Sequence, residues 1–156
     1  MNVEQKIEEA ALATAVRAVK VASEAILPFW PNALNSKFNQ DLELKIYEKE
    51  GVGNYATAAD LASGERIVGI FQSHPLLRRF NVVREEAQDI DQGSEYSLVI
   101  DEIDGTIQFN NGSENFRVSI GILKGDVPII GVLASPTQQL IMTARRGFGA
   151  HIETFN

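Results

Sequence analysis

The sequence contains no cysteine. Disulfide bonds, zinc sites built from thiolates and a thiol nucleophile are therefore excluded, and any bound metal must be held by oxygen atoms or imidazole rings. A chain without cysteine also fits a reducing compartment, so a cytoplasmic location is expected.

Basic residues and long apolar runs are also scarce. Lys and Arg number 14 against 21 Asp and Glu, the net charge is −7, and no basic cluster occurs. Binding to a nucleic acid chain or an anionic membrane through a basic face is therefore not expected. Apolar stretches such as Val127 to Ala134 fall far short of the ~20 residues that cross a bilayer, so no membrane partner is expected and the protein is interpreted as soluble.

What is present is typical of a globular protein: 156 residues, of which 44% are apolar and 22% charged. This length fits one domain spanning residues 1–156. Apolar residues recur at helical spacing from Val3 to Leu27, which predicts an amphipathic helix that Pro28 stops. Thr57 followed by Asp60 matches a capping box and predicts a second helix that ends near His74.

The second half of the chain changes to a β pattern. The predicted strands are Phe80 to Arg84, Tyr96 to Ile100, Phe116 to Leu123, Val127 to Ala134 and Gln139 to Ala144. Gly125-Asp126 and Pro136-Thr137 supply tight turns, so consecutive strands are expected to pair antiparallel. Alternation over residues 42–46 suggests one arm of a further strand pair, and no recognisable element follows the turn at Gly147–Gly149. The predicted class is α+β, with two helices packed on an antiparallel sheet.

One predicted strand runs directly into three acids within four positions. Asp101 and Asp104 lie three residues apart, so a tight turn could bring both carboxylates to one point, with the carbonyl of Ile103 as a third oxygen. Mg²⁺ prefers such ligands. Gly105 lets the backbone approach a ligand closely, and the amides of Gly105 and Thr106 could donate to phosphate oxygens. The alternative is that the two aspartates only cap a turn or short helix.

A second predicted strand also ends in carboxylates, at Glu85-Glu86. Taken alone, this pair is most simply interpreted as two solvent-exposed acids at the end of a strand. Because two strand ends can share one metal, its occurrence together with Asp101 and Asp104 favours a metal site.

These segments resemble the motifs of the inositol monophosphatase family of Mg²⁺-dependent, lithium-sensitive sugar phosphatases. The other matching segments are Tyr55 to Asp60, Val118 to Ile120 and Thr143 to Ala150. Their order and spacing agree over most of the chain. The resemblance implies hydrolysis of a small phosphorylated sugar or inositol with Mg²⁺ as cofactor, and inositol-1-phosphate ranks first among the substrates.

The resemblance also implies a set of metal ligands. Glu85, Asp101 and the carbonyl of Ile103 would hold the activating metal, and Asp101 with Asp104 would hold a second one. Lys49 matches a family lysine near the metals only loosely.

Other roles are implied in the same way. Thr106 and Glu85 would orient the attacking water, Asp60 would form a hydrogen bond with Thr106, and Gly105 with Thr106 would bind the phosphate. Capping alone also explains Asp60, and the two roles can coexist.

The chain departs from the family pattern at three positions near the site. Glu102 replaces a proline, which is expected to loosen the turn, and Gln108 replaces an asparagine. Arg84 stands where a small residue is usual, and its cation is expected beside the first metal.

Only the N-terminal half of the family's chain is matched. Family members continue into a second α/β half that supplies a further aspartate and most contacts to the substrate ring. The chain alone is therefore expected to be weak or inactive, with an uncovered surface that favours a homodimer or a partner covering the missing half. The alternative is a non-catalytic relative that serves as a metal-binding or dimerising interaction module.

Overall fold

A computed structural model describes residues 2–32, 47–48, 55–56 and 58–155 of the chain. The elements are α1 (Val3–Ile26), the 3₁₀ turn η1 (Leu27–Phe29), β1 (Tyr47–Glu48), β2 (Tyr55–Ala56), α2 (Ala58–Ser73), β3 (Asn81–Arg84), β4 (Tyr96–Asp104), α3 (Thr106–Asn110), β5 (Arg117–Lys124), β6 (Val127–Ser135), β7 (Leu140–Arg145) and β8 (Gly149–Thr154). The predicted strand arm over residues 42–46, Lys49, and Thr57 of the predicted capping box lie outside the described residues.

The first helix begins and ends where its local sequence dictates. Asn2 accepts a hydrogen bond from the Gln5 amide at 2.8 Å, and the Gln5 side chain accepts one from the Asn2 amide at 2.9 Å, which completes a capping box. Leu27 and Pro28 then tighten the chain into a 3₁₀ turn, because proline cannot continue the α-helical hydrogen bonds. The predicted helix is confirmed to within one residue.

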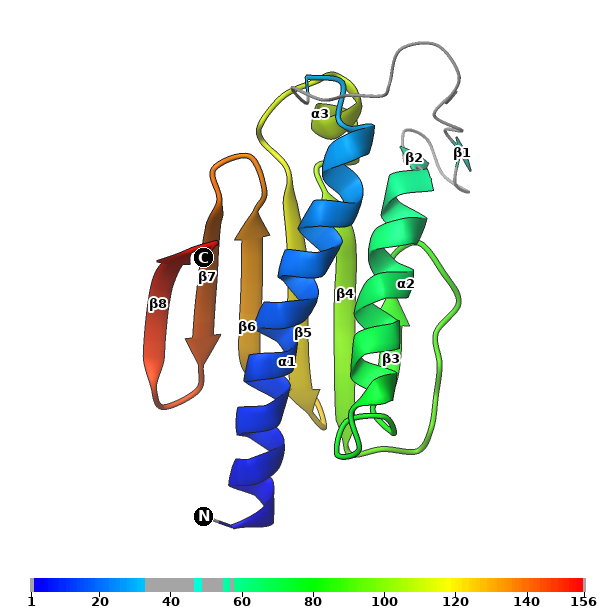
Figure 1. The fold of residues 1–156 in the computed structure, drawn as a ribbon. Helices are drawn as coiled ribbons and strands as arrows, with labels where there is room; N and C mark the ends of the chain where they lie inside the picture. Colours follow the sequence, from blue (N-terminus) through cyan, green and yellow to red (C-terminus); the bar gives the residue numbers. More distant parts are fainter. Residues whose placement is uncertain (1, 33–46, 49–54, 57, 156) are drawn as a thin grey trace.

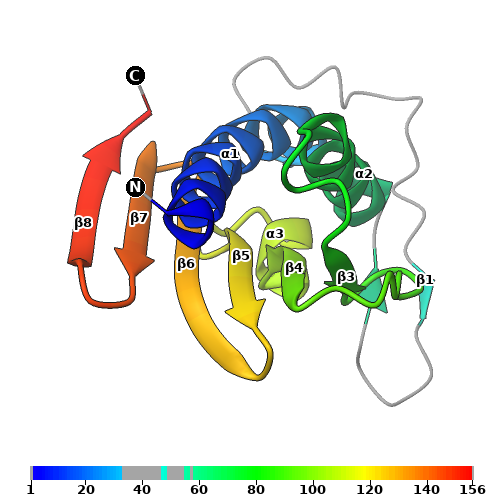
Figure 2. The ribbon, with the colours of Figure 1, turned by 90° about the horizontal axis from the view of Figure 1, so that it is seen from below.

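Both long helices lie on one face of a six-stranded sheet (Figures 1 and 2). The strands follow the order β3-β4-β5-β6-β7-β8. Alternate residues of the central strands are buried beneath the helices, as Val118, Ile120 and Ile122 of β5 illustrate. The α+β class is therefore confirmed. Among the described residues, no helix is long and apolar enough to cross a membrane.

The sheet is mixed, so the expectation that all consecutive strands pair antiparallel is wrong. β3 and β4 are parallel, with Val82 opposite Leu98 and Arg84 opposite Ile100. The chain after β3 first turns back along the outer edge of that strand, where Ile90 and Val82 exchange two backbone hydrogen bonds of 2.8 Å. It can then enter β4 in the direction of β3 without a crossover helix.

Two further boundaries differ from the sequence expectations. β4 does not stop at Ile100 but continues to Asp104, with an irregular register between Asp101 and Asp104, so the acids belong to the strand itself. The end of the chain forms β8, which pairs antiparallel with β7, where no element was expected. Every residue of β8 is exposed, so it lacks the apolar alternation that identifies strands in a sequence.

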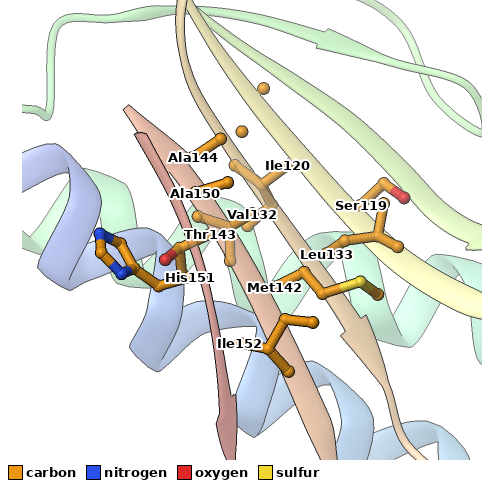
Figure 3. Close-up of a pocket in the computed structure, with 12 residues that line it drawn as sticks. Ser119, Ile120, Val132, Leu133, Met142, Thr143, Ala144, Ala150, His151 and Ile152 are labelled. Carbon is orange, nitrogen blue, oxygen red and sulfur yellow. The ribbon is translucent and has the colours of Figure 1, made fainter. Parts of the chain in front are cut away.

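The sheet face opposite the long helices carries a row of small residues. Gly121, Gly131, Ala144 and Ala150 lie opposite one another on β5, β6, β7 and β8. They line an open, mainly apolar hollow of about 620 Å³. Leu133, Met142 and Ile152 form the neighbouring row of this face, and Figure 3 shows their side chains near one another.

Candidate metal and phosphate site

The parallel pairing of β3 with β4 places two acidic strand ends side by side. Glu85 follows the last residue of β3, and its amide donates a hydrogen bond of 3.3 Å to the carbonyl oxygen of Ile100. Asp101 is the next residue of β4, and its side chain interacts with that of Glu85. The carboxyl ends of parallel strands meet at one edge of a sheet, so residues 16 positions apart in the sequence become neighbours.

The Asp101 carboxyl lies in surroundings that oppose its negative charge. Its burial, which is the largest cause, acts together with repulsion from and a hydrogen bond with Glu85, and with repulsion from Asp104 and Glu102, to raise the pKa of this group to about 7. One oxygen of Asp101 is also buried without a hydrogen-bond partner.

These observations test whether a divalent cation fits. Two adjacent carboxylates carry excess negative charge, and a buried oxygen lacks a donor, so a cation would relieve both. Glu85, Asp101 and the carbonyl of Ile103 are hard oxygen ligands of the kind that Mg²⁺ prefers. The residues present therefore fit the metal.

Fewer acidic side chains come together at the site than the sequence predicted. Within the described part of the chain, no three His, Cys, Asp or Glu side chains gather closely enough to form a metal site by themselves. Asp104 is exposed at the end of β4, whereas Asp101 is half-buried beside Glu85. A second metal held by Asp101 and Asp104 therefore stays a prediction.

Gly105 makes the turn that follows β4. Its φ of +88° lies in the left-handed region, and a Cβ atom there would be 2.8 Å from the carbonyl oxygen of Asn115. Glycine tolerates both the dihedral and the close approach. The turn leads directly into α3, whose first residue is Thr106.

Thr106 links this turn to the buried start of α2. Its hydroxyl donates to the carbonyl oxygen of Ile103 at 3.0 Å and lies 3.5 Å from Oδ1 of Asp60. Asp60 is fully buried in the first turn of α2. A hydroxyl has one proton, so the shorter contact with Ile103 is the stronger of the two. Asp60 and Thr106 thus lie close to each other, as the resemblance implied.

Arg84 and Glu102 form a contact that the sequence did not predict. Nε of Arg84 donates to Oε1 of Glu102 at 2.8 Å, and Glu102 is fully buried. The Arg84 side chain is directed toward Gly64 of α2 and its charge is paired with Glu102, so the expectation of a cation beside the first metal stays a prediction. The sequence did contain a signal for this ion pair, because a basic residue precedes Glu85 and an acidic residue follows Asp101.

A polar hollow opens beside the Gly105 turn. Its volume is about 420 Å³, and it is lined by Asp104, Gly105, Gln108, Asn115 and Arg117. Three of these residues bear amide or guanidinium donors suited to hydroxyl or phosphate groups. Gln108, a departure from the family pattern, thus lies at a place where a small polar molecule could reach the site.

Comparison with known protein families gives a match over almost the whole chain. The model of the inositol monophosphatase family matches residues 7–156. A fructose-1,6-bisphosphatase/inositol-1-monophosphatase of Aquifex aeolicus is 34% identical over 109 residues, which cover 67% of this chain and 39% of that protein. The Nus factor SuhB of Haemophilus influenzae is 31% identical over 106 residues, again 67% of this chain and 39% of that protein.

Solved structures resemble the fold. The extragenic suppressor protein suhB of Bartonella henselae superposes with a TM-score of 0.79 at 24% identity, over 92% of this chain and 52% of that one. CysQ of Bacteroides thetaiotaomicron superposes with a TM-score of 0.70 at 27% identity, over 93% of this chain and 49% of that one. The chain thus spans from about two fifths to one half of the length of these relatives.

Proposed function

Because the chain belongs to the inositol monophosphatase family, we propose that its acidic strand ends form the Mg²⁺ site of a phosphatase acting on small phosphate monoesters. The observation that carries the proposal is the adjacency of Glu85 and Asp101, whose mutual repulsion a divalent cation would relieve. Relatives named as inositol-1-monophosphatase and fructose-1,6-bisphosphatase support the reaction class.

The proposed metal ligands are the carboxylates of Glu85 and Asp101 and the carbonyl of Ile103, with Asp101 and Asp104 available to a second ion. When bound, Mg²⁺ supplies a water of lowered pKa and stabilises negative charge on the phosphate. Asp104 is exposed, so we expect it to hold a second ion only when further ligand atoms approach this end of β4.

Thr106 and Glu85 orient the attacking water in this proposal. The Thr106 hydroxyl can accept a hydrogen bond from that water while its own proton is held by Ile103 or by Asp60, at 3.0 and 3.5 Å. A proton held by the Asp60 carboxylate makes the hydroxyl oxygen the better acceptor. The amides of Gly105 and Thr106 at the turn bind the phosphate.

Inositol-1-phosphate is the first substrate to test, followed by fructose-1,6-bisphosphate. The hollow lined by Asp104, Gln108 and Arg117 offers polar contacts for a hydroxylated ring. The chain spans about half the length of its relatives, so we expect this chain alone to release phosphate slowly or not at all. A cytoplasmic location also stays an expectation.

The test is Mg²⁺-dependent phosphate release from both substrates, with Glu85→Gln and Asp101→Asn as site variants. Matched controls are Glu65→Gln and Asp126→Asn, which change exposed acids in α2 and in the β5–β6 turn. Site variants that keep full activity would remove this site from the reaction. Where the chain is inactive, calorimetric Mg²⁺ binding by the same variants tests the ligands.

A second candidate function is that of an interaction module. The row formed by Gly121, Gly131, Ala144 and Ala150 leaves an apolar hollow on the sheet face opposite α1 and α2 (Figure 3). Apolar surface of this kind favours self-association or a protein partner. A stable dimer in sedimentation together with no measurable Mg²⁺ binding would favour this function, and a monomer that binds Mg²⁺ would exclude it.

A further inference from the structure

We propose that the buried Arg84–Glu102 ion pair is a positioning device that holds the two acidic strand ends at the spacing a metal needs. The inference rests on the proposed function, since it concerns the carboxylates of Glu85 and Asp101. Neither Arg84 nor Glu102 contacts the metal or the substrate in this proposal.

The pair lies directly behind the two acids. Arg84 is the last residue of β3 and directly precedes Glu85, and Glu102 follows Asp101 on β4. Successive side chains of a strand point to opposite faces. The burial of β4 follows this rule as far as Glu102, with Ile100 and Glu102 buried and Asp101 half-buried. An ion pair on the helix face therefore ties the strands together where the acids emerge on the other face.

The geometry of the pair is suited to placement more than to stability. Nε of Arg84 lies 2.8 Å from Oε1 of Glu102, with side-chain exposures of 10% and 0%. Nη2 of Arg84 and Oε2 of Glu102 are buried without hydrogen-bond partners, so the contact is not bidentate. A buried pair with unmet hydrogen bonds recovers little of its desolvation cost, and apolar replacements of both partners are often as stable. What the ion pair adds is a defined separation between the two strand ends.

Helix α2 is shaped to accept the pair. A Cβ atom on Gly64 would lie 2.0 Å from Nη2 of Arg84 and 2.6 Å from Oε1 of Glu102. The hydroxyl of Ser63 donates to the carbonyl oxygen of Glu102 at 3.0 Å. Because the same helix carries Asp60, the pair fixes α2, β3 and β4 relative to one another at the site.

The decisive experiment separates placement from stability. The double variant Arg84→Met/Glu102→Leu removes both charges and keeps the volume apolar, so its melting temperature in chelator should equal or exceed that of the wild type. Its Mg²⁺ affinity, measured by calorimetry, should fall about 10-fold, as expected when groups that orient metal ligands are removed. Unchanged Mg²⁺ affinity in the folded double variant would overturn the proposal.

A second experiment leaves all charges in place. Gly64→Ala puts a methyl group where the Arg84 guanidinium lies and should weaken Mg²⁺ binding. The matched control is Gly69→Ala on the same helix, where an added Cβ meets nothing within 4 Å, so Mg²⁺ affinity should be unchanged. Equal Mg²⁺ affinities of the two alanine variants would contradict the proposal.

The outcomes also distinguish the two proposals. If Glu85→Gln and Asp101→Asn abolish Mg²⁺ binding while the double variant binds like the wild type, the positioning role fails and the proposed function stands. If the wild type binds no Mg²⁺, both fail. A double variant that does not fold is replaced by Gly64→Ala with its Gly69→Ala control.

Discussion

The amide of Glu85 donates a 3.3 Å hydrogen bond to the carbonyl oxygen of Ile100. This contact continues the parallel pairing of β3 and β4 one residue past Arg84 and brings Glu85 to the side of Asp101. Had the two strands been antiparallel, the acids would lie at opposite ends of the sheet. The orientation of one strand pair thus decides whether the two proposed metal ligands, Glu85 and Asp101, are neighbours.

The metal-free protein should lose stability as the pH rises. The pKa of Asp101 is raised to about 7 in the folded chain, against about 4 when unfolded. The folded state therefore binds the proton more tightly, and this contribution to stability is present at pH 4 and is lost as the pH rises through 7. Asp101→Asn removes this loss, so in chelator its melting temperature should exceed that of the wild type at pH 8 by about 3 °C or more.

The measurement is calorimetry at pH 5 and pH 8 with chelator present. The advantage of Asp101→Asn should shrink at pH 5. The exposed Asp126→Asn variant serves as the control and should follow the wild type at both pH values. A wild type that is as stable relative to Asp101→Asn at pH 8 as at pH 5 would contradict the raised pKa of Asp101, which burial and repulsion from Glu85 cause.

Added Mg²⁺ should raise the melting temperature of the wild type at pH 8. A ligand present at 100 times its dissociation constant stabilises the folded state by about 2.7 kcal/mol, which corresponds to roughly 5–10 °C for a chain of this size. Thermal unfolding followed with and without Mg²⁺ at pH 8 should show this gain for the wild type and not for Glu85→Gln. The control is Glu65→Gln, which should gain as much as the wild type, whereas an equal gain for Glu85→Gln would argue against Glu85 as a ligand.

The hydroxyl of Thr106 should matter more for catalysis than for folding. Thr106→Val keeps the shape but removes the 3.0 Å hydrogen bond to Ile103, at a cost of about 1 kcal/mol. If Thr106 orients the water, phosphate release should fall on the order of 100-fold, with Mg²⁺ affinity little changed. Thr106→Ser restores the hydroxyl and should recover most of the rate. Equal rates for the valine and serine variants would exclude the hydroxyl from the reaction.

The Gly105 turn should tolerate no side chain. Gly105→Ala meets both a φ of +88° and a carbonyl oxygen 2.8 Å from the new Cβ, so a loss of more than about 1 kcal/mol is expected. Gly93→Ala is the matched control, because Gly93 has a φ of +66° with nothing within 4 Å. Urea unfolding of both variants isolates the contact with Asn115, and equal losses would show that only the dihedral matters.

The helices could be predicted because their signals are local. Capping residues, the 3.6-residue apolar period and Pro28 act within a few positions of one another, and α1 and α2 end within one residue of the expected places. The two-residue turn at Gly125-Asp126 also formed as predicted, since Gly125 adopts a φ of +56° that favours glycine.

The strand errors have equally physical causes. β3 is parallel to β4 because the chain first turns back along β3, where Ile90 pairs with Val82. The local periodicity of apolar residues does not indicate such a turn. β8 was missed because all six of its residues are exposed, so its backbone pairing with β7 is its main stabilising contact.

The sequence by itself determined which groups are available for chemistry: hard oxygen ligands without any thiol, a glycine turn after an acidic strand, and an acid in the first turn of the second helix. It also carried the family resemblance. Only the tertiary structure decided which of these groups meet, placing Glu85 beside Asp101, leaving Asp104 exposed and turning Arg84 toward Glu102. The reason is that strand direction and side-chain pairing across a sheet depend on contacts between residues far apart in the chain, whereas helix and turn signals act between near neighbours.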